Sequence, residues 1–321
     1  MGRIAIRLFV SLMLAVGAMA AAAADFPTRP VRLVVPVPPG GALDAVARLI
    51  AAKLHDNWRQ PVIVENRAGA VGTIGVDYVA KSAPDGHTMV INAWSLIVAT
   101  PQMQRTPWDF ARDLVAVVQA AEIRYILAAS LKTGVSTIGE LIEVAKKDPG
   151  RLNYASPGNG SGMQLYTELV KSAAKINLTH VPYKGEGPAL QALLTGEIDL
   201  FFGTSGPMIP FVRAGKMRAL LVTGARPLES APNVPPFNTV YPAFSIDGWL
   251  GIFAPAATPK AIVDQIAADV RAAVLSPELS SRFREMGFEP TGVLSNRFGE
   301  IVRRDYEVWG QLIRENNIRA D

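Results

Sequence analysis

The sequence contains no cysteine. This absence excludes disulfide bonds, thiolate metal ligands, a cysteine nucleophile and the lipid-bearing cysteine of a lipoprotein, so the core alone must hold the fold. Histidine is scarce too, because only His55, His87 and His180 occur, each in a different part of the chain. Neither an H-E-x-x-H nor a G-x-S-x-G motif accompanies them. We interpret the histidines as isolated surface or loop residues and predict neither a metal site nor a catalytic residue.

Signatures of nucleotide and nucleic-acid binding are missing as well. The phosphate-loop motif G-x-x-x-x-G-K-[ST] does not occur. The glycine-rich turn at residues 158–162 lacks G-x-G-x-x-G spacing, and no acidic residue lies near the ribose position about 20 residues further on. The formal charge is +4, and it falls to +2 without Arg3 and Arg7. Lysine and arginine are scattered rather than clustered. We therefore predict no cofactor and no nucleic-acid partner.

Long apolar runs are absent except near the start of the chain. There, Arg3 and Arg7 precede a short apolar run, and an A-x-A site at residues 22–24 follows it. A membrane-spanning helix needs about 20 apolar residues, so this shorter run indicates a secretory signal peptide rather than an anchor. We predict that residues 1–24 are removed before Asp25 and that the mature protein lies in the periplasm.

Short β-branched runs alternate with stretches of helical periodicity from Val31 onward. Such alternation predicts a mostly parallel, doubly wound sheet with helices on both faces. The pattern occurs twice, and about 300 mature residues exceed the usual size of one core, so we predict two lobes. Strands are expected at residues 31–35, 62–64, 88–92, 152–155, 179–181, 198–202, 218–222 and 250–253. The proline-rich residues 227–242 are expected to be irregular, and the chain from Pro259 onward to be largely helical.

Two glycine-rich turns each lead from a strand into the start of a helix. The first contains Gly40 and Gly41, and the second covers residues 156–162. Helix starts present N–H groups without helical partners and the positive end of the helix dipole, which together stabilise an anion. Alternatively, the glycines only permit tight turns.

The position of these turns favours a shared ligand site. Ligands of open α/β sheets bind outside the carboxyl ends of the strands. If the two lobes face each other, both turns point into one cleft. A carboxylate is the expected ligand, because its two oxygens accept several N–H bonds at once.

Eight segments, taken in order, carry a resemblance to a known family. They are residues 34–44 (VVPVPPGGALD), 60–67 (QPVIVENR), 84–86 (PDG), 153–156 (NYAS), 180–185 (HVPYKG), 213–220 (RAGKMRAL), 232–235 (PNVP) and 249–255 (WLGIFAP). They span nearly the whole mature chain and resemble the receptors of the tripartite tricarboxylate transporters, the TctC or Bug family.

The resemblance implies a type II periplasmic-binding-protein fold that closes on its ligand between two lobes. One lobe would combine residues 25–124 with 248–321, and the other would hold residues 125–247. The implied function is capture of a small organic carboxylate and delivery to a large and a small membrane subunit, TctA-like and TctB-like, by a protein that is no enzyme. We expect a monomer.

The same resemblance implies that backbone N–H groups and water grip the ligand carboxylate at two loops, which fall on the two turns described above. The predicted ligand-binding residues are Gly40, Gly41, Ala42, Ser95, Ser156, Gly158, Gly160, Ser161, Gly203 and Thr204.

The sequence departs from the family pattern at several cleft positions. Leu43 stands where a hydroxyl residue is common, Gln164 where a histidine is frequent, and Gly203 with Thr204 where an aspartate is often found; Val37 replaces a frequent phenylalanine. These losses, with Trp94 on a strand-tip loop, lead to the hypothesis of a ligand with one carboxylate and an apolar or aromatic body. The alternative for Trp94 is ordinary core packing.

Other functions stay open on the sequence alone. The receptor could be an orphan sensor that feeds a signalling system. A periplasmic α/β enzyme would need an acid–base pair, and Asp44 and Glu186, its candidates, fit better as groups that cap helix starts. A transcription regulator would need a DNA-binding module where the signal peptide stands.

Overall fold

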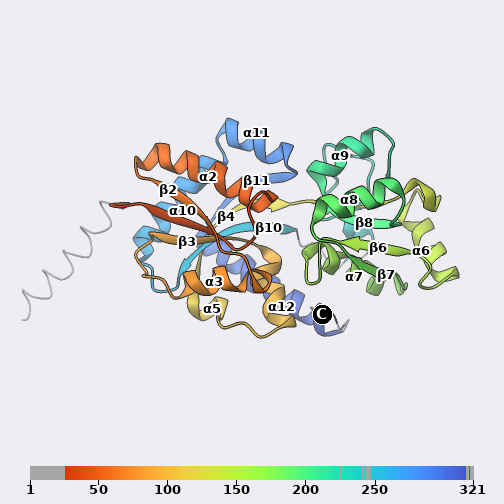
Figure 1. Cartoon of the computed structure of the whole chain (residues 1–321), viewed down its shortest axis with the longest axis horizontal. Helices are drawn as coiled ribbons and strands as arrows, with labels where there is room; N and C mark the ends of the chain where they lie inside the picture. The colour runs from red at the N-terminus through yellow and green to blue at the C-terminus, as the bar shows by residue number, and fades with distance from the viewer. Residues whose placement is uncertain (1–25, 225, 241, 243–246, 316–317, 319–321) are drawn as a thin grey trace, which may run out of the picture.

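The computed structural model describes residues 26–224, 226–240, 242, 247–315 and 318, and these form two α/β bodies side by side (Figure 1). The predicted signal peptide lies outside the described residues. None of the described helices combines the length and the apolar character that a bilayer crossing requires.

The first body is built around a mixed sheet of six strands in the order β11-β4-β10-β3-β1-β2. Strand β1 pairs in parallel with β2 and β3, whereas β10 runs antiparallel to β3 and β4, and β11 antiparallel to β4. The strands are β1 (Val31–Val35), β2 (Val62–Asn66), β3 (Thr88–Ala93), β4 (Leu114–Ile123), β10 (Gly248–Pro255) and β11 (Phe288–Leu294).

Amphipathic helices cover this sheet. Helix α2 shows why: Val46, Ile50 and Leu54 recur at a spacing of one turn and are fully buried, while Arg48 on the other face is exposed. The helices of this body are α2 (Ala42–Trp58), α3 (Thr73–Ala80), α4 (Thr100–Met103), α5 (Phe110–Asp113), α10 (Lys260–Val274), α11 (Pro277–Glu285) and α12 (Ser295–Glu315), with the short turns η1 (Ala70–Gly72) and η2 (Ser95–Ala99).

The second body is built around a mixed five-stranded sheet in the order β7-β6-β8-β5-β9. Strand β6 is parallel to β7 and β8, and β5 is antiparallel to β8 and β9. Its strands are β5 (Tyr125–Ala129), β6 (Asn153–Ser156), β7 (Thr179–Pro182), β8 (Leu200–Thr204) and β9 (Arg218–Val222). Its helices are α6 (Ile138–Lys147), α7 (Gly162–Ala174), α8 (Glu186–Thr195) and α9 (Ser205–Arg213), with the turns η3 (Leu131–Thr133) and η4 (Phe237–Thr239).

The α/β class and the two bodies are as the sequence predicts, with less parallel pairing than expected. Strands β5 and β10 each enter the centre of a sheet antiparallel to both neighbours, which makes both sheets mixed. The end of the chain is largely helical, as predicted, but the strand β11, which was not expected, lies between α11 and α12. Pro290 and Gly292 conceal this strand in the sequence, and an edge position tolerates both.

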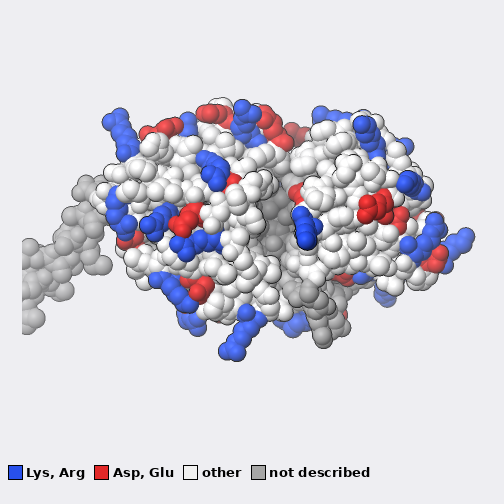
Figure 2. Space-filling view, in the orientation of Figure 1, with Lys and Arg blue, Asp and Glu red and all other residues white. Residues whose placement is uncertain are grey.

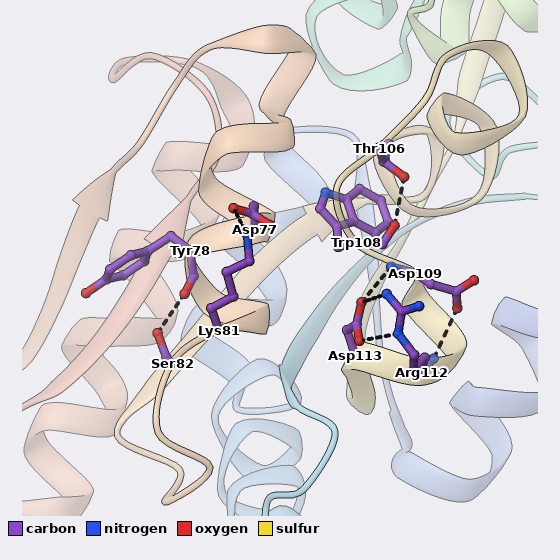
Figure 3. A network of polar contacts seen from close by, with 9 residues as sticks. All are labelled: Asp77, Tyr78, Lys81, Ser82, Thr106, Trp108, Asp109, Arg112 and Asp113. Carbon is purple, nitrogen blue, oxygen red and sulfur yellow. Dashed lines mark hydrogen bonds and ion pairs between the residues drawn. The ribbon is translucent and has the colours of Figure 1, made fainter.

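A polar network anchors the entry into the long strand β4 (Figure 3). Asp109 caps α5, and its carboxylate accepts from the N–H groups of Ala111 at 2.9 Å and Arg112 at 3.1 Å. Asp113 accepts from the Asp109 N–H at 2.8 Å and from the Arg112 guanidinium at 2.7 Å. This arrangement ends α5 where β4 begins, and β4 then runs to the boundary between the two sheets.

Candidate ligand-binding site between the two sheets

The first predicted turn joins β1 to α2 and is exposed. Gly40 has a φ of +90°, which favours glycine, but Gly41 has an ordinary extended backbone with a φ of −82°. A Cβ added at Gly41 would meet no described heavy atom within 4 Å. Turn geometry therefore explains Gly40. Neither turn geometry nor packing requires a glycine at position 41, but Gly41 stands at the N-cap of α2, a position that glycine suits. The N–H groups of Ala42 and Leu43, in the first helical turn, also have no partner within α2.

Asp44 fixes the shape of this first turn. Its carboxylate accepts from the Gly40 N–H at 3.0 Å, from Arg48 Nε at 2.9 Å and from Asn66 Nδ2 at 2.9 Å. The hydrogen bonds from Arg48, joined by those from Gly40 and Asn66, outweigh burial and lower the pKa of Asp44 to about 2. Asp44 is thus a clamp that stays ionised at neutral pH, which agrees with the capping role expected from the sequence and leaves Gly40 without a free N–H for a ligand.

The second predicted turn joins β6 to α7 and bonds largely to itself. Ser156 is fully buried, and its Oγ accepts from the Gly158 N–H at 3.2 Å. The Gly160 N–H donates to Gln164 Oε1 at 2.6 Å, and Ser161 Oγ caps α7 by accepting from the Gln164 N–H at 3.4 Å. The N–H groups at Gly158 and Gly160 therefore shape the turn. At the start of α7, those of Gly162 and Met163 have no helical partner.

His180 lies beneath this turn, contrary to the interpretation of an isolated histidine. Its Nε2 is 2.7 Å from Ser156 Oγ, and its Nδ1 is 3.4 Å from Gln164 Nε2. Its ring stacks on Tyr154 with 4.7 Å between the ring centroids. One sequence signal bears on this contact, because Ser156 follows directly after the strand expected at residues 152–155 and His180 lies in the strand expected at residues 179–181. The pairing of β6 with β7, which brings the two residues together, comes from the structure.

Gly203 and Thr204 end β8 and are both buried. A Cβ at Gly203 would collide with Met208 and Phe201, so packing explains this glycine. The Thr204 N–H and Oγ1 donate to the two oxygens of Glu186, at 2.6 and 2.9 Å. Burial raises the pKa of Glu186 against the effect of these bonds. Glu186 therefore holds the tip of β8, the supporting role that the sequence favoured over acid–base chemistry.

Trp94 belongs to the core, so the alternative of ordinary core packing holds and the ring does not face a ligand. Its side chain is only 1% exposed and stacks on Trp309 with 4.4 Å between centroids. It also packs edge-on against Tyr166 of α7. Trp94 therefore offers no open face to a ligand. Ser95, the next residue, is half-buried at the start of η2, where its carbonyl accepts from Thr100 Oγ1 at 3.2 Å.

The tips of β1 and β3 and the start of α7 lie close together where the two bodies meet, and we call the depression of the surface at this junction the groove (Figure 2). A Cβ at Gly162 would lie 2.8 Å from Trp94 Cζ2, so the start of α7 touches the tip of β3 directly. A Cβ at Gly72 would lie 2.8 Å from Leu96 and 3.2 Å from the Pro36 carbonyl, which links η2 to the first turn. The surface is hollowed where the two bodies meet (Figure 2).

The tip of β2 leads into a strained loop at residues 69–72. Residues 69–72 all have positive φ, including Val71 at 52°, a conformation that a β-branched residue rarely adopts. Val71 is 47% exposed and Ile74 is 52% exposed. Strain of this kind concentrates at functional positions. Val71 lies in this loop and Ile74 in the first turn of α3, and Gly72 and Gly75 of the same segment lie against Pro36, which follows β1.

Arg124 and Asp247 tie together the two segments that pass between the sheets. Arg124 Nε donates to the Thr223 carbonyl at 2.9 Å and lies 3.4 Å from Asp247 Oδ1. The Tyr125 N–H donates to Thr223 Oγ1 at 3.0 Å. Burial raises the pKa of Asp247 to about 6, although Arg124 opposes the shift. The two crossings thus form one bonded unit.

A second contact between the bodies lies at the start of α9. Ser205 Oγ donates to the Gly287 carbonyl at 3.3 Å, and a Cβ at Gly206 would collide with the Met286 backbone. Two α/β bodies, linked by two crossing segments and facing each other with their strand tips, define the class of solute-binding proteins.

Comparison with known proteins identifies the family. The family model described as the tripartite tricarboxylate transporter family receptor, TctC, matches residues 46–318. The chain belongs to this family of binding receptors, so the resemblance seen in the sequence is confirmed, as is the prediction that the chain is not an enzyme. It is 35% identical over 301 residues to a Pseudomonas sp. strain P51 protein encoded in the tcbD-tcbE intergenic region, covering 92% of this chain and 89% of the other.

Solved structures confirm the periplasmic-binding-protein fold. The R. palustris protein Rpa4515 with adipate superposes with a TM-score of 0.81 at 32% identity, over 92% of this chain and 99% of the other. MatC of Rhodopseudomonas palustris with bound malate gives 0.78 at 30% identity, over 90% and 100%. The periplasmic binding protein BugD gives 0.79 at 28% identity, over 92% and 99%.

Proposed function

We propose that this chain captures a small organic carboxylate in the periplasm and delivers it to the large and small membrane subunits of a tripartite transporter. The ligand lies between a first lobe, residues 25–124 with 248–321, and a second lobe, residues 125–247. Support comes from the family, from relatives described as periplasmic or as holding adipate or malate, and from the geometry of the two turns.

Gly41 is the observation that carries the proposal. Its backbone conformation suits any residue and its Cβ position is open, so among the described residues only its N-cap position in α2 favours glycine over a larger apolar residue. An open face over an N–H group at a helix start is what a carboxylate oxygen needs for close approach. Gly41, Ala42 and Leu43 therefore supply N–H donors from one side of the groove.

The remaining predicted residues divide into donors and supports. Gly162 and Met163, at the start of α7, supply donors from the second lobe. Hydrogen bonds or packing within the protein already engage the predicted residues of the second lobe, and we assign these residues to shaping the site. The hydrogen-bonded ones are Ser156, Gly158, Gly160, Ser161 and Thr204, and the packed one is Gly203. Gly40 supports the first turn, and Ser95 lies beside the groove at the tip of β3.

The apolar side chains near the first turn favour a ligand with an aliphatic body. Val71 and Ile74 are exposed and Leu43 is half-buried, so a hydrocarbon chain that covers them leaves water. The ring of Trp94 is buried, so it cannot stack on an aromatic ligand and gives no support to an aromatic ligand body. We propose an aliphatic mono- or dicarboxylate.

Thermal unfolding of the purified chain with a panel of carboxylates tests this function. A ligand at 100 times its Kd adds about 2.7 kcal/mol to the free energy of unfolding, so a binding carboxylate raises Tm by several degrees. In the variant Gly41→Val, the side chain covers the N–H groups of the first turn, and we expect the ligand-dependent rise in Tm to disappear. The ligand-free Tm should fall only slightly, because valine is a poorer N-cap residue than glycine.

The matched control is Gly187→Val. Gly187 is exposed, and a Cβ there also meets no described heavy atom within 4 Å, but it lies in α8 rather than at the first turn. The control should keep the full rise in Tm. No shift with any carboxylate, together with a clear shift from sugars or cations, would overturn the proposal.

Uptake measurements test delivery to a transporter. Deleting the gene for this chain should abolish cellular uptake of the carboxylate that the panel identifies, and expressing the chain again should restore this uptake. Uptake that persists while a cellular response to the carboxylate is lost would favour the sensor role instead.

A further inference from the structure

The hydrogen bonds beneath the second turn have only one consistent direction. A backbone N–H can only donate, so Gly160, 2.6 Å from Gln164 Oε1, fixes the oxygen of that amide. The NH2 group of Gln164 then faces His180 Nδ1 at 3.4 Å, and this nitrogen must accept. In the neutral ring the hydrogen is therefore on Nε2, which donates to Ser156 Oγ at 2.7 Å.

Ser156 completes the chain of bonds back to the turn. Its Oγ accepts from His180 and from the Gly158 N–H at 3.2 Å, and its hydroxyl donates to the Gly158 carbonyl at 3.1 Å. The relay thus runs from Gly160 through Gln164, His180 and Ser156 to Gly158. Both ends of this relay lie in the same turn. If the ring of His180 gains or loses a proton, at least one hydrogen bond of the relay is broken.

The surroundings of His180 keep its ring neutral. Its side chain is half-buried, and burial lowers the pKa of the ring. Glu168 of α7 raises this pKa and Lys171 of α7 lowers it, both by charge. These two groups form an ion pair with each other at 2.8 Å. Tyr154 of β6, stacked on the ring, is hydrogen-bonded to Glu168.

We propose that neutral His180 is a positioning residue that holds the turn at residues 156–161 in its binding shape, and that protonation of His180 releases the turn and weakens carboxylate binding. A protonated ring carries hydrogen on Nδ1, which faces the NH2 group of Gln164. Rotating that amide would remove this clash, but it would set NH2 against the Gly160 N–H, 2.6 Å away. The binding consequence rests on the proposed function, whereas the effect on the turn does not.

Ligand-free NMR tests the relay itself. Imidazole nitrogen shifts of the full chain at pH 7.5 should show hydrogen on Nε2 of His180, with the resonance assigned by its loss in His180→Gln. Amide exchange of Gly160, corrected for the intrinsic effect of pH, should lose about tenfold in protection as His180 becomes protonated, the factor that one broken hydrogen bond gives. Hydrogen on Nδ1 at pH 7.5, or protection of Gly160 that ignores the titration of His180, would overturn the proposal.

Three variants separate positioning from simple packing. His180→Gln keeps a donor for Ser156 but cannot be protonated, so Gly160 should stay protected both at pH 7.5 and at the lower pH at which NMR shows His180 of the parent chain to be protonated. His180→Phe keeps a ring to stack on Tyr154 but forms no hydrogen bond, so protection should be low at both pH values. His55→Gln, at an exposed position on α2, should behave as the parent chain.

The binding arm uses adipate as the probe, measured by calorimetry at pH 7.5 and at the lower pH at which the NMR titration shows His180 of the parent chain to be protonated. The affinity of the parent chain should fall about tenfold more than that of His180→Gln, because protonation of adipate itself affects both equally. An equal fall in both would overturn the link between His180 and binding. If adipate does not bind, the proposed ligand class loses support, and the exchange experiment still decides whether the relay holds the turn.

Discussion

Asp44 shows how one carboxylate shapes a binding turn without facing a ligand. Its side chain is 5% exposed, and the hydrogen bonds from Arg48, Gly40 and Asn66 occupy its oxygens. The local sequence makes this possible, since Arg48 lies one helical turn after Asp44 and Gly40 lies just before the helix. Asn66, by contrast, comes from the end of β2 and reaches Asp44 only in the folded chain.

Replacing this carboxylate should destabilise the chain in a pH-dependent way. The folded pKa of Asp44, about 2, lies below its ordinary value of 3.8, so its contribution is present above pH 3.8 and is lost as the pH falls towards 2. We expect Asp44→Asn to lower the free energy of unfolding by about 2 kcal/mol at pH 7. The difference should shrink below pH 3.

Urea unfolding at pH 7 and pH 3 checks this prediction. Asp56→Asn is the control, because Asp56 lies on the same helix and is exposed, and it should change the free energy of unfolding by less than about 0.5 kcal/mol. A similar loss in both variants would mean that Asp44 is not a clamp.

Among the elements, helix α7 links the turn, the groove and the core. It starts at Gly162, against the Trp94 ring, and continues through Tyr166, which contacts Trp94, Tyr125 and Trp309. The aromatic rings therefore join the tip of β3, the start of β5, α7 and α12 into one buried cluster. This cluster sets where the second turn stands relative to the first body.

A larger side chain at the start of α7 should disrupt this contact. In Gly162→Val the new Cβ would lie 2.8 Å from the Trp94 ring, and overpacking of this kind costs about 1–3 kcal/mol. Denaturant unfolding measures the loss. Gly139→Val is the matched control in the first turn of α6, where the nearest atom to a Cβ is 3.9 Å away, and a control as unstable as Gly162→Val would contradict the prediction.

The elements also show where sequence patterns succeed. Strands with alternating or β-branched runs and a glycine turn behind them, such as β1 and β6, lie where the patterns place them. Strands β4 and β5 were not predicted, because they form one long, mainly apolar run interrupted by Gln119, Glu122 and Arg124, and such a run does not distinguish strand from buried helix. Their antiparallel pairing depends on partners far away in the sequence.

For the molecule as a whole, the crossing unit of Arg124 and Asp247 governs how the two bodies are joined. The side chains are 12% and 22% exposed, so the pair is well shielded from water. Burial raises the pKa of Asp247 to about 6, above its ordinary 3.8. A carboxyl group with a raised pKa binds its proton more tightly in the folded chain, so its contribution is favourable below pH 3.8 and is lost as the pH rises through 6.

Asp247→Asn should remove this part of the pH dependence. Between pH 4 and pH 7, the free energy of unfolding of the parent chain should fall by up to about 3 kcal/mol more than that of the variant. Thermal and urea unfolding across this range measures the difference. Asp264→Asn, at an exposed position, should retain the parent slope; if Asp247→Asn also retains it, the buried carboxylate is not the source.

The sequence by itself determined the family, the two α/β units and the two glycine turns, because strand and helix periodicity, glycine chemistry and linear motifs depend on residues close together in the chain. Tertiary structure decided which N–H groups of those turns face outward. Gly40 is held by Asp44 and Gly160 by Gln164, within one helical turn, but the contacts of Ser156 with His180 and of Gly162 with Trp94 join residues from separate elements. Such contacts follow from how sheets and helices pack, so the side of each turn that meets a ligand is a property of the folded molecule.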